Sequence, residues 1–202
     1  MATVNLEPNA DVSNSPAWTL STGSDVYALI DEDHTGAPHT DSLQIYTTAA
    51  GKKCVVQFDD FDSTGVASID SVQAVLRVAN AVKGQIYVVG MTIGNNGTGN
   101  ANWAEEYSSE SASRDWETVT FTSRTTSTSG GSAWTDTDVD NLTMEIHAVA
   151  MSGGTFRVTY AYFIVTYGLA PGYKHDVLGV DSGDISTING IATADISKVS
   201  GV

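Results

Sequence analysis

An acidic pattern that occurs twice provides the residue types of a metal site. Each copy has the form DxDxTG, followed by an aspartate ten residues after the first. Calcium loops cluster carboxylates at alternate positions before a glycine, because a hard cation takes oxygen ligands and the chain must turn sharply. Ser42 and Ser71 stand where such a loop carries its last glutamate. We therefore expect ordinary acidic turns, with calcium as the alternative at six residues: Asp31, Asp33, Asp41, Asp60, Asp62 and Asp70.

The other candidate groups form no catalytic or zinc-binding pattern. His34 and His39 lie close enough in sequence to join Asp31 or Asp33 as metal ligands, but their spacing matches no specific signature. No GxSxG elbow for a nucleophilic serine occurs, and the two buried carboxylates of a glycosidase cannot be singled out among 24 acidic residues. We therefore expect no enzyme, no catalytic residue, and no cofactor apart from the calcium alternative.

Aromatic residues stand in the two longest polar stretches of the chain. Trp103 and Tyr107 lie in residues 95–115, and Trp134 lies in residues 123–138. Exposed aromatic rings at loop tips stack on sugar rings or anchor protein partners. The alternative is a ring that folds back to cap an end of the fold, which we expect for Trp134 and leave open for Trp103. Trp103 and Tyr107 are thus the candidate glycan-binding residues.

The charge balance excludes two classes of partner. The chain has 24 acidic and 9 basic residues, a formal charge of -15, so nucleic acid and anionic membrane surfaces repel it. Cys54 is the only cysteine, which rules out an internal disulfide and a thiolate zinc site. The N-terminus lacks a signal-peptide pattern, and no run of about 18 apolar residues occurs. We expect a protein that is made in a cytoplasm and stays soluble.

Short apolar segments between clusters of Gly, Asp, Asn, Ser and Thr run from about residue 25 to 167. This rhythm is typical of an all-β fold, and we expect an antiparallel β-sandwich of jelly-roll type with an extended C-terminal arm. The two longest polar stretches are predicted loops, and a hairpin is predicted to join the last two strands through residues 152–155. Eight segments are predicted strands: 25–30, 42–48, 53–61, 70–80, 84–93, 116–122, 141–151 and 155–167.

Apolar alternation assigns the core-facing side of several strands. Two sets of alternating residues mark it: Val72, Ala74, Leu76 and Val78, then Leu142, Met144, Ile146 and Ala148. The last strand begins in the same way, with Phe156, Val158, Tyr160 and Tyr162 on one face, but its second face is apolar too. Something must cover that second face. We therefore predict a partner-binding sheet face at Ala161, Phe163 and Val165.

The chain ends on a phrase that occurs twice, ISTINGI at residues 185–191 and ISKVSGV at residues 196–202. Composition changes near residues 168–172, so we divide the chain into an N-terminal arm and first turn (1–24), a sandwich domain (25–167), and a linker with the repeated tail (168–202). The tail is a loose terminus or an arm that docks on a partner by strand addition. The docking hypothesis involves six β-branched residues: Ile185, Ile188, Ile191, Ile196, Val199 and Val202.

Three stretches resemble structural proteins of tailed bacteriophages, which are mostly small β-sandwich virion proteins. LEPNADVSNSPAWTLSTGSDVYALIDED is similar to their recurring opening of a Pro-Asn dipeptide, a later Trp, and a Tyr followed by an Ile-Asp-Glu step. AWTDTDVDNLTMEI with FRVTYAYFIVTY is similar to their closing part, where a Trp-Thr corner leads into the last two strands. The tail is similar to their ISKxNG repeats, although Ser200 stands where asparagine is commoner.

This resemblance implies a non-enzymatic virion protein, assembled in the host cytoplasm. The first hypothesis is a capsid decoration (cement) protein that binds the shell through its sandwich and terminal arm. Its partner is then the major capsid protein or another virion protein, and closed symmetry favours a homo-oligomer, with a trimer preferred. The alternative is a tail or head fibre subunit that acts as a carbohydrate- or receptor-binding module through Trp103 and Tyr107.

Overall fold

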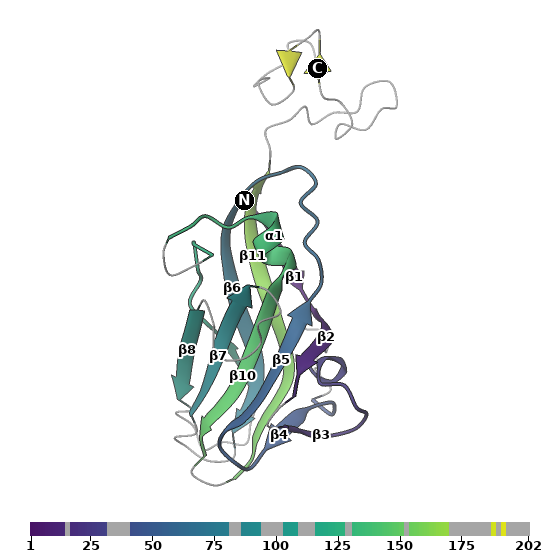
Figure 1. Ribbon diagram of the computed structural model, residues 1–202, viewed down its shortest axis with the longest axis vertical. Coiled ribbons are helices and arrows are strands. Elements are labelled where there is room, and N and C mark those ends of the chain that lie inside the picture. The colour runs from purple at the N-terminus through teal and green to yellow at the C-terminus, as the bar shows by residue number, and fades with distance from the viewer. Residues whose placement is uncertain are drawn as a thin grey trace.

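Two antiparallel sheets stack face to face in the computed structural model of this chain (Figure 1). Side chains from both sheets form the hydrophobic core between the layers. The structure describes ten stretches: residues 1–14, 17–31, 41–80, 86–93, 103–108, 116–127, 131–151, 154–169, 187–188 and 191–192.

Sheet A is built around the two longest strands, β6 and β11. Its strand order is β3-β4-β11-β6-β9, and β1 also pairs with β11. β11 thus has β6 along one side, and on the other side β4 near its start and β1 near its end. The strands of sheet A are β1 (Ala2–Leu6), β3 (Thr19–Leu20), β4 (Ile45–Thr47), β6 (Val66–Asn80), β9 (Trp116–Thr120) and β11 (Phe156–Leu169).

Sheet B has the strand order β2-β5-β10-β7-β8. Its strands are β2 (Pro8–Ser13), β5 (Lys52–Phe58), β7 (Ile86–Ile93), β8 (Trp103–Ser108) and β10 (Leu142–Ala150). Two short helices connect strands, η1 (Tyr27–Leu29) and α1 (Asp136–Asp140). Helix α1 begins with a capping box, in which the side chains of Thr135 and Asp138 each accept a hydrogen bond from the other's backbone N–H.

The connectivity of the strands from β4 to β11 is that of a jelly roll. Within sheet A the order is β4-β11-β6-β9, and within sheet B it is β5-β10-β7-β8. The chain therefore passes repeatedly from one layer to the other, and each central pair joins strands that are distant in sequence. Two four-stranded antiparallel layers with this order are the double-sheet jelly roll. The predicted fold class is confirmed.

The N-terminal residues belong to both layers. β1 pairs with the end of β11 in sheet A, and after Glu7 the chain crosses to sheet B, where β2 pairs with β5. The backbone N–H of Asp59 donates to the carbonyl of Glu7 at this crossing, with an N···O distance of 2.9 Å. Residues 1–24, predicted as an arm and first turn, thus contribute three strands to the sandwich.

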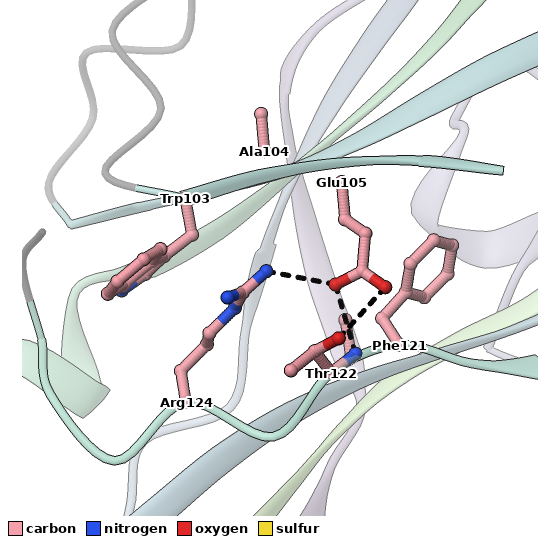
Figure 2. A pocket seen from close by; sticks show the side chains of 7 residues that line it. Trp103, Ala104, Glu105, Phe121, Thr122 and Arg124 are labelled. Atoms are coloured by element: carbon pink, nitrogen blue, oxygen red, sulfur yellow. Dashed lines mark hydrogen bonds and ion pairs between the residues drawn. The ribbon is translucent and has the colours of Figure 1, made fainter.

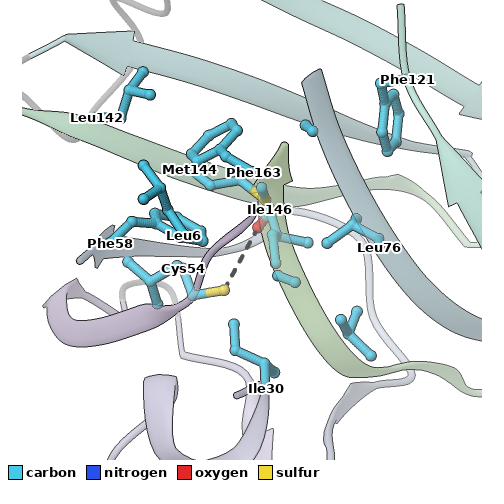
Figure 3. Close-up of a cluster of buried hydrophobic side chains, with 14 of the residues drawn as sticks. Leu6, Ile30, Cys54, Phe58, Leu76, Phe121, Leu142, Met144, Ile146 and Phe163 are labelled. Atoms are coloured by element: carbon cyan, nitrogen blue, oxygen red, sulfur yellow. Dashed lines mark hydrogen bonds between the residues drawn. The ribbon is translucent and has the colours of Figure 1, made fainter. Parts of the chain in front are cut away.

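The core confirms the predicted core-facing sides of two strands (Figure 3). Both predicted alternating sets, on β6 and β10, are at most 1% exposed. The Phe58 and Phe163 rings, from opposite sheets, have their centroids 4.5 Å apart. Cys54 is fully buried beside them, and its thiol donates to the carbonyl of Ile146 across the β5–β10 pair at 4.0 Å.

A β-bulge in β11 overturns the prediction of an apolar outer face. Val158 pairs with Val78, but Tyr160 pairs with Arg77, so Thr159 is an additional residue in β11. The extra residue moves every later side chain to the opposite face. The predicted partner-binding residues Ala161, Phe163 and Val165 therefore face the core, with 0% exposure, and are not an open surface. Tyr160 and Tyr162 lie on the outer face instead.

Other sequence predictions also differ from the structure. Residues 25–30 form the turn of η1 rather than a strand, because the two carboxylate oxygens of Asp11 accept from the backbone N–H groups of Val26 and Tyr27. The predicted loop 95–115 contains strand β8. The predicted hairpin between the last two strands is wrong, since β10 pairs with β5 and β7, whereas β11 lies in the other sheet.

The repeated tail lies largely outside the described residues. Within it, β12 (Thr187–Ile188) and β13 (Ile191–Ala192) pair antiparallel, with Ile188 opposite Ile191. The remaining predicted arm residues, Ile185, Ile196, Val199 and Val202, fall outside the described residues. No helix in the described ranges combines the length and the apolar character that crossing a membrane requires.

Candidate functional site

The second acidic copy forms a turn rather than a metal site. Oδ1 of Asp62 accepts from the backbone N–H of Thr64 at 3.0 Å, and hydrogen bonds from Thr64 hold the pKa of Asp62 below its usual value. Asp70 instead accepts from the hydroxyl of Ser68 at 2.8 Å. Within the part of the chain that the structure describes, no three His, Cys, Asp or Glu side chains come together as metal ligands. The acidic turn expected from the sequence is present at Asp62 and Thr64, and the calcium alternative at Asp60, Asp62 and Asp70 finds no support in the described residues.

The first acidic copy is only partly described. Asp41 forms a bidentate ion pair with Arg77, with distances of 2.8 Å from Nε to Oδ1 and 3.0 Å from Nη2 to Oδ2. Asp31 makes a backbone bridge to Tyr160, and burial raises the pKa of its carboxyl. The remaining candidates, Asp33, His34 and His39, lie outside the described residues, as does His175.

Trp103 and Arg124 close one edge of the sandwich. Trp103 lies on β8, the edge strand of sheet B, and its indole N–H donates to the carbonyl of Thr126 at 3.0 Å. The guanidinium carbon of Arg124 lies 4.6 Å from the centroid of the Trp103 ring. Trp103 and Tyr107 are half-buried and pack against the core. This arrangement favours the packing role that the sequence left open for Trp103, because Arg124 covers one face of the ring.

Glu105 completes this edge (Figure 2). Its carboxylate accepts from the backbone N–H and the hydroxyl of Thr122, both at 3.0 Å, and from Nη2 of Arg124 at 2.9 Å. The cavity beside these residues has a free volume of about 10 Å³, which is the room for roughly one water molecule. A sugar ring does not fit into it.

Trp134 is buried, as predicted, with 5% of its surface exposed. Its indole N–H donates to the carbonyl of Arg124 at 2.8 Å, and its backbone forms a bridge to Ile69 of β6. Trp134 thus holds the segment after β9 against sheet A, and it is a packing residue.

The outer face of sheet A carries a row of four side chains on adjacent strands. Tyr46 pairs with Arg157 across β4 and β11, Arg157 with Ala79 across β11 and β6, and Ala79 with Trp116 across β6 and β9. The sequence neighbours of the first three, Ile45, Phe156 and Val78, are buried in the core, so these three side chains point outward. Trp116 lies on the same face because it pairs directly with Ala79. We call Tyr46, Arg157, Ala79 and Trp116 the Tyr46–Trp116 row.

Three of the four side chains in the Tyr46–Trp116 row provide its exposed surface. Tyr46, Arg157 and Trp116 are half-exposed, whereas Ala79 is 3% exposed. Neighbouring strands lie about 4.8 Å apart, so three strand spacings separate the two aromatic ends by about 14 Å. Two aromatic platforms at this distance fit a ligand longer than a single ring.

A second group of side chains lies beside this row on the same face, where Tyr160 pairs with Arg77 and Arg77 with Thr118. The hydroxyl groups of Tyr160 and Thr118 are joined by a hydrogen bond of 2.8 Å, and the Tyr160 ring centroid lies 5.6 Å from that of Tyr162. The guanidinium carbon of Arg77 lies 5.9 Å from the centroid of the Trp116 ring, while Asp41 holds the other end of the guanidinium. Arg77 is thus fixed against Trp116 and helps to orient it.

The surroundings of Tyr162 on this face disfavour ionisation of its hydroxyl group. Burial raises the pKa of the Tyr162 hydroxyl, and the neighbouring Tyr160 and Glu7 raise it further. Tyr162 is therefore a neutral phenol at physiological pH. Such a hydroxyl group acts both as a donor and as an acceptor of hydrogen bonds.

The Tyr46–Trp116 row is not among the sites predicted from the sequence. The sequence carries a signal for it, because Tyr46 is one residue from the buried Ile45 and Trp116 is three residues from the buried Val119. Residues at such odd separations lie on opposite faces of a strand, so each aromatic ring faces away from the core. The bulge in β11 hid the face, because the alternation read along residues 156–162 placed Tyr160 and Tyr162 in the core. The periodicity of a single strand also does not show which residues of four paired strands lie side by side.

Solved structures of other proteins resemble this chain, but the similarity is low. No protein-family model and no curated protein match it. A CBM36-1 domain of a xylanase from the hindgut metagenome of Trinervitermes trinervoides is 12% identical, with a TM-score of 0.35 over 82% of this chain and 97% of that chain. The carbohydrate-binding module CBM6cm-2 of Cellvibrio mixtus lichenase 5A, solved with cellotriose, is 12% identical, with a TM-score of 0.41 over 81% and 97%.

A xylan-binding module, CBM15, is likewise 12% identical, with a TM-score of 0.38 over 81% of this chain and 95% of that chain. Superpositions this loose assign neither a family nor a ligand. The class of this protein is therefore defined by its own strand order, as a jelly-roll β-sandwich.

Proposed function

We propose that this protein is a non-catalytic carbohydrate-binding module whose ligand lies along the Tyr46–Trp116 row. The observation that carries the proposal is the pairing of two half-exposed aromatic residues, Tyr46 and Trp116, at opposite ends of one row on a sheet face. Aromatic rings offer a large apolar surface with little conformational freedom to lose, and the edge polar groups fix a ligand's orientation. A chain of sugar rings presents both kinds of surface.

This site replaces the one predicted at Trp103 and Tyr107. Arg124 covers one face of the Trp103 ring, and the adjoining cavity of about 10 Å³ has no room for a sugar. On the outer face of sheet A, by contrast, Tyr46, Arg157 and Trp116 are partly exposed, and the β6 residue between Arg157 and Trp116 is the small Ala79. The carbohydrate-binding hypothesis is thus kept, with Tyr46 and Trp116 in place of Trp103 and Tyr107.

A glycan array followed by calorimetry on the strongest hit tests the proposal. We expect Trp116→Ala and Tyr46→Ala each to weaken binding about 10-fold or more, as removal of an aromatic anchor does. Glu106→Ala, which changes an exposed residue of β8 in the other sheet, serves as the control and should bind as the native protein does. The proposal fails if no glycan binds, or if binding survives in both aromatic variants.

We propose a second role, in the virion of a tailed phage, because a specific feature of the sequence favours it. The phrase ISTINGI is echoed by ISKVSGV at the C-terminus, and the residues on either side of Asn189-Gly190 pair as β12 and β13. In this role the protein decorates the shell or forms part of a fibre, and the tail attaches it to the major capsid protein or another virion protein.

Deletion of residues 184–202 tests the virion role. We expect the truncated chain to fold, since the sandwich ends at Leu169, but to be lost from purified particles. Light scattering of the full chain tests the accompanying expectation of a homo-oligomer, with a trimer preferred. Equal incorporation of the truncated and full-length chains would contradict attachment through the tail.

A further inference from the structure

Arg157 occupies an unusual position in this acidic protein. Three arginines lie in the described ranges, and two of them are paired with carboxylates: Arg77 with Asp41, and Arg124 with Glu105. For Arg157 no ion pair is formed with any other described residue. A chain with 24 acidic and 9 basic residues thus keeps a cation without a described counter-charge in the middle of the Tyr46–Trp116 row.

The surroundings of Arg157 raise the cost of leaving its charge unpaired. The side chain is half-buried and stands on a central strand between Tyr46 and Ala79, away from any sheet edge. Partial removal of a charged group from water is unfavourable unless another group compensates it. A guanidinium offers donors in a planar fork that matches the two oxygens of a carboxylate or a sulfate.

We propose that the ligand of the Tyr46–Trp116 row is an acidic oligosaccharide, and that its carboxylate or sulfate group binds Arg157. This inference rests on the proposed carbohydrate-binding function and specifies its ligand class. Tyr46 and Trp116 stack on sugar rings at the two ends of the row, and Arg157 binds the anionic group between them. The Arg157 side chain is partly exposed, so a ligand on this face can reach it.

Calorimetry of the full chain with three probes tests the inference. The probes are an oligogalacturonate, which carries carboxylates, a sulfated galactan oligomer, and a neutral cello-oligosaccharide of similar length. We expect at least one acidic probe to bind more tightly than the neutral one. Arg157→Gln should weaken that binding about 10- to 100-fold, the range for loss of a charge-assisted hydrogen bond, whereas Arg157→Lys should weaken it less.

Two controls keep the test specific to Arg157. Lys52→Gln removes one positive charge from β5 in the other sheet and should leave binding unchanged. Circular dichroism and thermal melting verify that each variant is folded. Which acidic probe binds decides between a carboxylate and a sulfate as the recognised group.

The outcomes separate the inference from the function on which it rests. Tight binding of the neutral probe with no preference for either acidic probe overturns the acidic ligand but leaves carbohydrate binding in place. An equal loss of acidic and neutral binding in Arg157→Gln also overturns it. Arg157 would then maintain the structure of the face and would not bind the anionic group of the ligand. Absence of binding to all three probes and to the glycan array overturns both proposals.

Discussion

Arg124 lies over the ring of Trp103, with 4.6 Å between the guanidinium carbon and the ring centroid. The two residues come from different layers of the sandwich, since Trp103 is on edge strand β8 of sheet B and Arg124 follows β9 of sheet A and bridges to Val72 of β6. Glu105 adds an ion pair to Arg124 at 2.9 Å. This contact fastens the two sheets together where both would otherwise end in open edges.

The Arg124–Trp103 contact is expected to stabilise the fold. Arg124→Ala should lower the free energy of unfolding by about 1 to 2 kcal/mol, through loss of the cation–π contact and the ion pair to Glu105. Trp103→Ala should cost about 2 to 3 kcal/mol, because the indole is half-buried. Urea denaturation of both variants and the double variant measures the coupling, with exposed Glu106→Ala as control. Strictly additive losses would contradict a direct contact.

The bulge at Thr159 predicts which residues of β11 carry stability. Phe163 is fully buried between the sheets, whereas its neighbour Ile164 is half-exposed on the outer face. Phe163→Ala should therefore cost about 3 to 5 kcal/mol, and Ile164→Ala about 1 kcal/mol. Thermal or denaturant unfolding compares them. A larger loss in Ile164→Ala than in Phe163→Ala would contradict the bulge, because it would place Ile164 in the core and Phe163 on the outer face.

Strand positions with strong apolar alternation were predictable from the sequence. Val72 and Leu76 on β6, like Met144 and Ile146 on β10, face the core as their period of two requires. The partners of these strands were not predictable in the same way. A hairpin from β10 to β11 satisfies the same alternation as the actual arrangement, in which these strands lie in different sheets.

Strands β8 and β2 were not predicted from the sequence, and each has a physical reason. β8 has the sequence WAEEYS, and its edge position allows the exposed Glu106 to face solvent, so it lacks the composition of a buried strand. β2 begins at Pro8 and contains Asp11, whose carboxylate caps η1. The Tyr46–Trp116 row depends on pairing across β4, β11, β6 and β9, and the outward orientation of Tyr160 and Tyr162 depends on the extra residue Thr159. Neither is encoded in a local pattern.

The buried thiol of Cys54 is expected to be unreactive in the folded protein. Burial raises its pKa, and the negative charges of Asp11 and Glu145 raise it further. Because the thiolate is the reactive form, iodoacetamide should modify Cys54 at the rate at which the chain unfolds, and quickly in urea. Mass spectrometry measures both rates. Fast labelling under native conditions would show that the β5–β10 pair opens locally.

His147 predicts a loss of stability in mild acid. Burial and the positive charge of Lys53 lower the pKa of His147, and the opposing effect of Glu145 is smaller. The unfolded chain, with a histidine pKa of about 6.5, then binds more protons than the folded one. The free energy of unfolding should therefore fall as the pH drops below about 6.5 and on through the lower folded pKa.

His147→Gln isolates this effect, because glutamine does not titrate. The variant should lose less stability than the native protein between about pH 7.5 and pH 5 in urea denaturation, since the proton uptake of the unfolded histidine is gone. Lys53→Met provides a second measurement, because removal of the neighbouring cation should raise the pKa of His147 in an NMR titration. If His147 titrates at its ordinary value in the native protein, this pH dependence vanishes, and if it titrates above that value, the sign reverses. In either case the outer face of sheet B shields this imidazole less than the structure indicates.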